Sequence, residues 1–163
     1  MFVVDYTMTK AIMGERPKFD LPNPKFLELV TEEGFKKLIN DFYEEVIDSE
    51  IAYFFPDDEE ELEQVKIKNG MYFMMMCGGN RDYFAKMHGE KDQVKFHDNN
   101  FSIPDKARYE WLGCWELVLR PLEKTIEHDL IQSYWNWIEV FSKHIVNFEN
   151  DRETLEDKVN LNK

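Results

Sequence analysis

Apolar residues recur at three- and four-residue spacing in four long segments of this 163-residue chain. That spacing places them along one face of an α-helix, whereas a strand would need strict alternation. A chain of this length can bury a core in one domain without disulfides or structural metals. The pattern therefore predicts an all-α domain over residues 31–149, preceded by an N-terminal extension (1–30) and followed by a charged tail (150–163).

The first two helices carry clear start and stop signals. Thr31 is placed to cap the first, because a threonine hydroxyl accepts from the free N–H groups of the first turn. Glu32 and Glu33 follow it, where the helix dipole favours negative charge. The second helix is expected to begin in the acidic run 57–61 and to end at Gly78-Gly79, a common C-terminal signal.

The remaining segments are marked by prolines and acidic residues. A third helix is expected from Pro104-Asp105, with Pro121 shortening its last turns. Asp129 is positioned to cap a fourth, whose apolar period continues to Phe148. Residues 1–24 show no period and contain three prolines, so we expect an irregular segment that lies across the body of the domain.

Charge and composition exclude several classes of partner. The formal net charge is -13, from 33 acidic and 20 basic residues. Such a chain repels phosphate backbones and anionic lipid, so neither nucleic acid nor a membrane is an expected partner. No stretch approaches the roughly 20 apolar residues of a membrane helix, and no signal peptide is visible. With only two cysteines, a cytoplasmic setting is expected. An aromatic content of 15% is compatible with a large flat ligand or with a partner surface.

Common metal and nucleotide motifs are missing. A di-iron carboxylate bundle needs Glu-x-x-His pairs, and none of the four histidines has a glutamate three residues before it. The His-Glu-x-x-His zinc pattern, paired-cysteine zinc sites and glycine-rich phosphate loops are also absent. What remains is a set of single residues on or near buried helix faces.

Three of these residues carry polar groups into apolar faces. Asn69 stands in the predicted buried face that also holds Tyr72, and an unsatisfied buried amide costs about 1–3 kcal/mol. Tyr43 and Trp111 lie on the buried faces of the first and third helices, and each has a group that needs a hydrogen-bond partner. Taken singly, Tyr43 and Trp111 fit an ordinary core, and His97 in the long connection fits a solvated loop. Asn69 favours a polar cavity.

Several motifs occur together in the order found in truncated haemoglobins, and the chain most resembles their group II branch over residues 34–148. In chain order they are Phe42-Tyr43, Phe55-Pro56, Gly78-Gly79, Gly89 followed eight residues later by His97, the block Trp111-Leu112-Gly113-Cys114, and the stretch from Lys143 to Asn147. One departure is Phe96, which stands where the family often has a basic residue.

The resemblance implies a two-on-two helical sandwich that encloses haem b. His97 would be the iron ligand, and Tyr43 and Trp111 would donate hydrogen bonds to a bound gas. The residues implied to contact the cofactor are Phe54, Phe55, Val65, Lys68, Asn69, Tyr72, Phe96 and His97.

The expected ligand is dioxygen or another diatomic gas, held firmly by the two distal donors. Firm retention favours redox chemistry on nitric oxide or peroxide, with a reductase as partner, over oxygen transport. A dioxygenase or peroxidase-like activity is therefore open, as is a simple oxygen store. The alternative is a globin-like sensor or interaction module without haem. The sequence predicts no oligomeric state.

Overall fold

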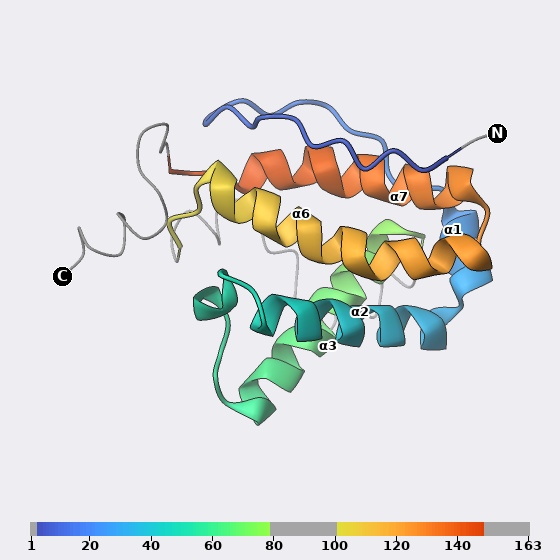
Figure 1. Cartoon of the computed structure of the whole chain (residues 1–163), viewed down its shortest axis with the longest axis horizontal. Coiled ribbons are helices and arrows are strands. Elements are labelled where there is room, and N and C mark those ends of the chain that lie inside the picture. The colour runs from blue at the N-terminus through green and yellow to red at the C-terminus, as the bar shows by residue number, and fades with distance from the viewer. Residues whose placement is uncertain (1–2, 79–100, 149–163) are drawn as a thin grey trace.

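The computed structural model describes residues 3–78 and 101–148 (Figure 1). These residues contain five α-helices and no strand, with two short 3-10 turns between helices and a third after the last helix. The α-helices are α1 (Pro24–Val30), α2 (Glu32–Ile47), α3 (Glu59–Met76), α6 (Asp105–Leu119) and α7 (His128–Phe141), and the 3-10 turns are η1 (Ala52–Phe54), η2 (Arg120–Lys124) and η3 (Ser142–Ile145). The predicted all-α class is confirmed for this part of the chain.

The helices form two crossing pairs. α2 packs against α3 and α6, and α6 packs against α7, so that the α2–α3 pair faces the α6–α7 pair (Figure 1). Large aromatic side chains fill the centre: Phe42 of α2 stacks on Trp115 of α6 with ring centroids 4.2 Å apart. Both rings are fully buried. This arrangement is the two-on-two sandwich that the sequence predicted.

The predicted helix signals work as expected at α2 and α3. The Thr31 hydroxyl accepts from the Gly34 N–H at 3.1 Å and caps α2. Asp58 caps α3 by accepting from the Glu61 N–H at 3.0 Å. α3 ends before Gly78, which has a φ of 94° and would bring an added Cβ within 3.2 Å of the Pro24 side chain. Glycine is therefore required there on two grounds.

The N-terminal part contains a helix that the sequence pattern did not predict. α1 has only seven residues, too few to show a period, with Pro24 at its first position. Asn23 caps it by accepting from the Lys25 N–H at 3.0 Å. Phe26 and Leu27 are buried against the core. A short helix of this kind is stabilised by packing rather than by its own propensity.

The last helix is shorter than predicted, and Asp129 does not cap it. Its N-cap residue is Glu127, and Asp129 lies in the first turn, where its charge still suits the dipole. α7 ends at Phe141 although the apolar period continues further. Beyond η3, Asn147 accepts from the Ile103 N–H at 2.6 Å through its side chain and donates its own N–H to the Ile103 carbonyl at 3.0 Å. Pairing with residue 103 replaces continuation of the helix.

The segment that precedes α1 lies along α7 in two limbs, as Figure 1 shows. The chain reverses near Gly14, which has a φ of 90°. Val4 and Ala11 are buried, and Tyr6 and Met8 pack partly buried against the core. The expectation that this segment crosses the body of the domain is met.

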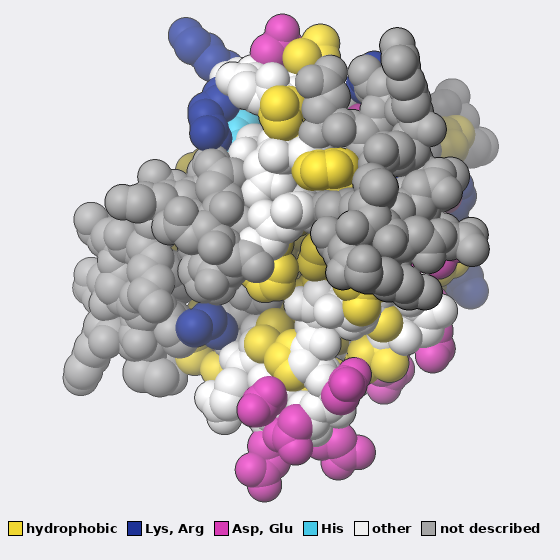
Figure 2. All heavy atoms as spheres, turned by 90° about the vertical axis from the view of Figure 1, so that its left-hand side faces the viewer, with side chains coloured by type: hydrophobic (Ala, Val, Ile, Leu, Met, Phe, Trp, Pro, Cys, Tyr) yellow, Lys and Arg dark blue, Asp and Glu magenta, His cyan; other side chains and the backbone are white. Residues whose placement is uncertain are grey.

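The surface seen in Figure 2 has acidic side chains at one end and hydrophobic side chains in its middle. Three glutamates, Glu59, Glu60 and Glu61, occupy the first turn of α3, where the helix dipole favours negative charge. Among the helices that the structure describes, none has both the length and the apolar character to cross a membrane.

Candidate functional site

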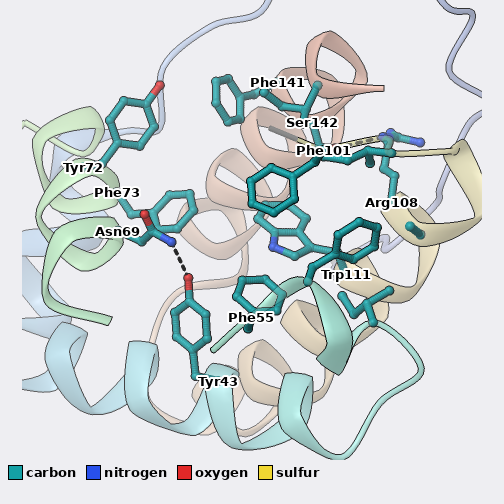
Figure 3. A pocket seen from close by; sticks show the side chains of 15 residues that line it. Tyr43, Phe55, Asn69, Tyr72, Phe73, Phe101, Arg108, Trp111, Phe141 and Ser142 are labelled. Atoms are coloured by element: carbon teal, nitrogen blue, oxygen red, sulfur yellow. Dashed lines mark hydrogen bonds between the residues drawn. The ribbon is translucent and has the colours of Figure 1, made fainter. Parts of the chain in front are cut away.

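A cavity opens between α2, α3, α6 and the end of α7 (Figure 3). The free space in the cavity and at its mouth is about 900 Å³, a figure that includes open solvent. Aromatic side chains supply most of its wall. The lining residues are Tyr43, Ile51, Phe54, Phe55, Asn69, Tyr72, Phe73, Phe101, Ile103, Ala107, Arg108, Trp111, Phe141, Ser142 and Ile145.

Tyr43 and Asn69 form a polar pair on one side of this cavity (Figure 3). The Asn69 amide nitrogen donates to the Tyr43 hydroxyl oxygen at 2.6 Å. Within the described part of the chain, no group accepts the proton of the Tyr43 hydroxyl. Because Asn69 occupies a lone pair of this oxygen, the O–H bond remains available as a donor. The pair therefore offers a hydrogen bond to a ligand in the cavity.

Burial keeps this donor protonated. The Tyr43 side chain is 1% exposed, and desolvation raises the pKa of its hydroxyl to about 12, while the hydrogen bond from Asn69 acts in the opposite direction. Loss of hydration penalises the phenolate, which is the charged form. At neutral pH the side chain is a hydrogen-bond donor and not an anion.

Trp111 and Phe55 complete the walls around this pair. The Phe55 ring lies edge-on to Tyr43 with centroids 5.6 Å apart. Trp111 packs edge-on against Phe42 at 5.7 Å, and its indole N–H has no acceptor among the described residues. Two N–H or O–H donors and several flat rings therefore face an otherwise apolar space, an arrangement suited to a planar apolar molecule with a small polar ligand beside it.

The other side of the cavity holds a buried ion cluster around Arg108 (Figure 3). The Arg108 side chain is 1% exposed and pairs with Glu139 and Asp105. Its Nε donates to the Ser142 hydroxyl at 2.8 Å, and Nη1 donates to the Thr9 carbonyl at 2.9 Å and to Asp105 at 3.1 Å. Nη2 donates to the Glu139 carbonyl and carboxylate. All five donors are thus used, and Arg108 offers no free N–H to a ligand.

Comparison with solved structures identifies the fold. Hell's gate globin IV, solved with phosphate bound, superposes with a TM-score of 0.77 at 27% sequence identity over 90% of each chain. The group II truncated haemoglobin of Bacillus anthracis gives 0.68 at 23% identity, covering 87% of this chain and 99% of that one. The truncated oxygen-avid haemoglobin of Bacillus subtilis gives 0.65 at 23%, covering 75% and 98%. This chain folds as a truncated globin.

Sequence comparison alone does not reach this result, because no protein-family model and no curated protein matches the chain. The likeness of this chain to its structural neighbours therefore lies in the helix arrangement more than in residue identity. Which molecule the cavity binds depends on the side chains of this chain.

The cavity brings together most of the residues singled out in the sequence. Val65 is half-buried against the core and Lys68 is exposed, and neither lines the cavity. Phe96 and His97 lie outside the described residues. The predicted site residues that line the cavity are Tyr43, Phe54, Phe55, Asn69, Tyr72 and Trp111.

Sequence reasoning missed the Arg108 side of the cavity. Arg108 precedes Trp111 by one helical turn, so a charged residue stood in an apolar face of the third helix. This is the same kind of signal that drew attention to Asn69. Ser142 and Phe101 had no such signal, because they lie beyond the regular helices and only the tertiary fold brings them to the wall.

The donors for a metal ion are not found in the described residues. In residues 3–78 and 101–148, no group of three or more His, Cys, Asp or Glu side chains is placed to hold one. A haem iron needs a single axial ligand from the protein rather than such a cluster. The flat, mostly apolar wall of the cavity has the chemical character of a haem site, and none of its lining residues is a histidine, so an axial imidazole would have to come from elsewhere in the chain.

The pKa of Tyr43 predicts how stability changes at high pH. The folded pKa of about 12 exceeds the ordinary tyrosine pKa of 10.0, so unfolding releases a proton between these values. The contribution of Tyr43 is fully present below about pH 10 and is lost as pH rises towards 12. Urea unfolding at pH 8, 10 and 11 should show a weaker alkaline loss of stability in Tyr43→Phe than in the wild type. Equal losses in the two proteins would contradict this assignment.

Proposed function

We propose that this truncated globin binds haem b through His97 and retains a diatomic ligand, such as dioxygen, for redox chemistry on nitric oxide or peroxide. The observation that supports this most directly is the Tyr43–Asn69 pair, a buried donor held toward an aromatic cavity with no acceptor of its own in the described chain. A donor left without an acceptor in a dry cavity costs free energy unless a ligand accepts from it.

The roles of the side chains follow from their positions. Tyr43 donates to the ligand, and Asn69 fixes the direction of that donation. Trp111 adds an indole N–H from α6. Phe54 and Phe55 at η1 supply flat apolar surface that excludes water from the same space. A bound haem would supply an iron that binds the gas and draws partial negative charge onto it.

The donors favour retention over transport. A hydrogen bond to a charged or partly charged acceptor contributes about 1.5–3 kcal/mol, and each 1.4 kcal/mol slows release by about tenfold when association is unchanged. Arg108 donates no hydrogen bond to the ligand, because all its donors are already used within the protein. The proposed site thus favours a neutral ligand that becomes partly negative when bound. Turnover requires electrons from a separate reductase.

Haem uptake by the purified chain tests the proposal. Titration with haemin should give a Soret band that saturates at one haem per chain, and His97→Ala should lose the band or shift it to that of loosely held haem. His88→Ala is the matched control, because it removes an imidazole from the same connection and should leave the spectrum unchanged. Turnover of nitric oxide by the reduced, oxygenated protein then separates redox chemistry from oxygen storage.

Two outcomes would overturn the assignment. Absence of a Soret band in folded wild-type protein would favour the alternative, a globin-like module without haem. Equal spectra for the wild type and His97→Ala would show that His97 is not the iron ligand.

A further inference from the structure

The N-terminal limb that crosses α7 is bound through its backbone in a repeating way. Residues 4–11, which we call the clip, form hydrogen bonds to side chains of α6 and α7 through the backbone of every second residue. The bonds join Asp5 N–H to Gln132 at 2.6 Å, Thr7 carbonyl to the Trp135 indole at 3.2 Å, Thr9 N–H to Glu139 at 3.3 Å, Thr9 carbonyl to Arg108 at 2.9 Å, and Ala11 N–H to Asp105 at 2.9 Å.

The side chains that bind the clip form one groove. Gln132, Trp135 and Glu139 are spaced three and four residues apart, so they share one face of α7, and Asp105 and Arg108 share one face of α6. Val4, just before the first of these bonds, is buried, and Tyr6, between the first two, packs edge-on against Trp135 with centroids 5.1 Å apart. Backbone bonds with alternate side-chain pockets are a general way of binding an extended peptide.

This groove and the cavity share a wall. Arg108 and Ser142 line the cavity, and Arg108 also donates to the Thr9 carbonyl of the clip. One arginine side chain therefore separates the clip from the cavity. Glu139, which pairs with Arg108, accepts both the Thr9 N–H and the Thr9 hydroxyl. Losing the clip would take one acceptor away from Arg108 and two donors away from Glu139, which weakens a buried network whose bonds support one another.

We infer that the docking of the clip and the occupancy of the cavity are coupled through Arg108. A molecule that fills the cavity restricts the motion of the Arg108 and Ser142 side chains. This ordering favours the conformation in which Arg108 donates to the Thr9 carbonyl. The docked clip in turn keeps the cavity wall closed and slows loss of the occupant. Coupling of this kind is reciprocal, so each partner must strengthen the other by the same factor. The inference does not require that the occupant is haem.

Amide hydrogen exchange in the full-length chain tests whether an occupant of the cavity stabilises the docked clip. Two probes are used separately: haemin, and 8-anilinonaphthalene-1-sulfonate, which fluoresces in apolar cavities. Either probe should slow exchange of the Thr9 and Ala11 amides, on the order of fivefold or more. Unchanged exchange at these amides with both probes overturns the inference. If the dye slows exchange while haemin does not and gives no Soret band, the coupling stands and the proposed haem function fails.

A matched pair of variants tests whether the docked clip slows loss of the occupant from the cavity. Thr9→Val removes a hydroxyl that donates to Glu139 at 3.1 Å, whereas the Thr7 hydroxyl bonds only to Asp5 within the clip itself. Thr9→Val should therefore speed both clip exchange and probe dissociation severalfold, and Thr7→Val should leave probe dissociation unchanged. Equal dissociation rates in the two variants would show that the clip and the cavity are independent.

Discussion

Tyr43→Phe is expected to speed dioxygen release from the ferrous protein by roughly 10- to 100-fold. The substitution keeps the ring that packs against Phe42 and Phe55 and removes only the hydroxyl. Loss of one hydrogen bond to a partly charged ligand costs about 1.5–3 kcal/mol, which appears mainly as faster dissociation. Stopped-flow displacement of dioxygen by carbon monoxide measures the rate directly.

Three further variants define what the Tyr43 result means. Trp111→Phe should also speed release, since it removes the second donor in the cavity. Asn69→Leu should give an intermediate effect, because the Tyr43 hydroxyl remains but its direction is no longer fixed. Tyr53→Phe is the control, as Tyr53 is 55% exposed and lies outside the lining. If Tyr43→Phe and Tyr53→Phe release dioxygen at the same rate, distal hydrogen bonding is not the mechanism.

Arg108→Met should lower the free energy of unfolding by about 3–5 kcal/mol. The substitution keeps much of the apolar stem but removes the only cation that contacts both Asp105 and Glu139 in the described chain. Two carboxylates would then be left in a buried site without their guanidinium partner. Urea unfolding followed by circular dichroism at pH 7 measures the loss.

Arg120→Met provides a matched comparison. Arg120 also pairs with a carboxylate, that of Glu116 at 2.6 Å, but its side chain is 57% exposed. Exposed pairs of this kind contribute about 0–1 kcal/mol. A similar loss of stability in both variants would mean that the Arg108 cluster is no more important than a surface ion pair.

The helix boundaries show how far sequence reasoning reaches. The starts of α2 and α3 were predicted because capping residues and acidic runs act through local hydrogen bonds and the helix dipole, and the start of α6 was predicted from the proline that precedes Asp105. The end of α7 was not, because it is set by the pairing of Asn147 with Ile103, 44 residues earlier in the chain. The hydrophobic period alone carried no information about that pairing. α1 escaped notice because seven residues are too few to establish a period.

In the candidate site, too, residues with a local sequence signal were predicted, and contacts between distant residues were not. Asn69 was singled out as a polar residue in an apolar face, and it lies in the cavity beside Tyr43. Arg108 offered the same signal but had no motif to draw attention to it. The contact between Arg108 and Thr9 joins residues 99 positions apart, so no local pattern could reveal it. The role predicted for His97 stays a prediction.

The contacts between the clip and α7 join residues 127 to 130 positions apart, which sets an order of events as the chain is made. A ribosome that adds about 5–20 residues each second needs on the order of ten seconds to extend the chain from the clip to α7. During that interval residues 4–11 have left the ribosome but have no partner. The nascent protein therefore gains its complete cavity wall only after α7 has been made, so stable capture of a cofactor is expected only after that point.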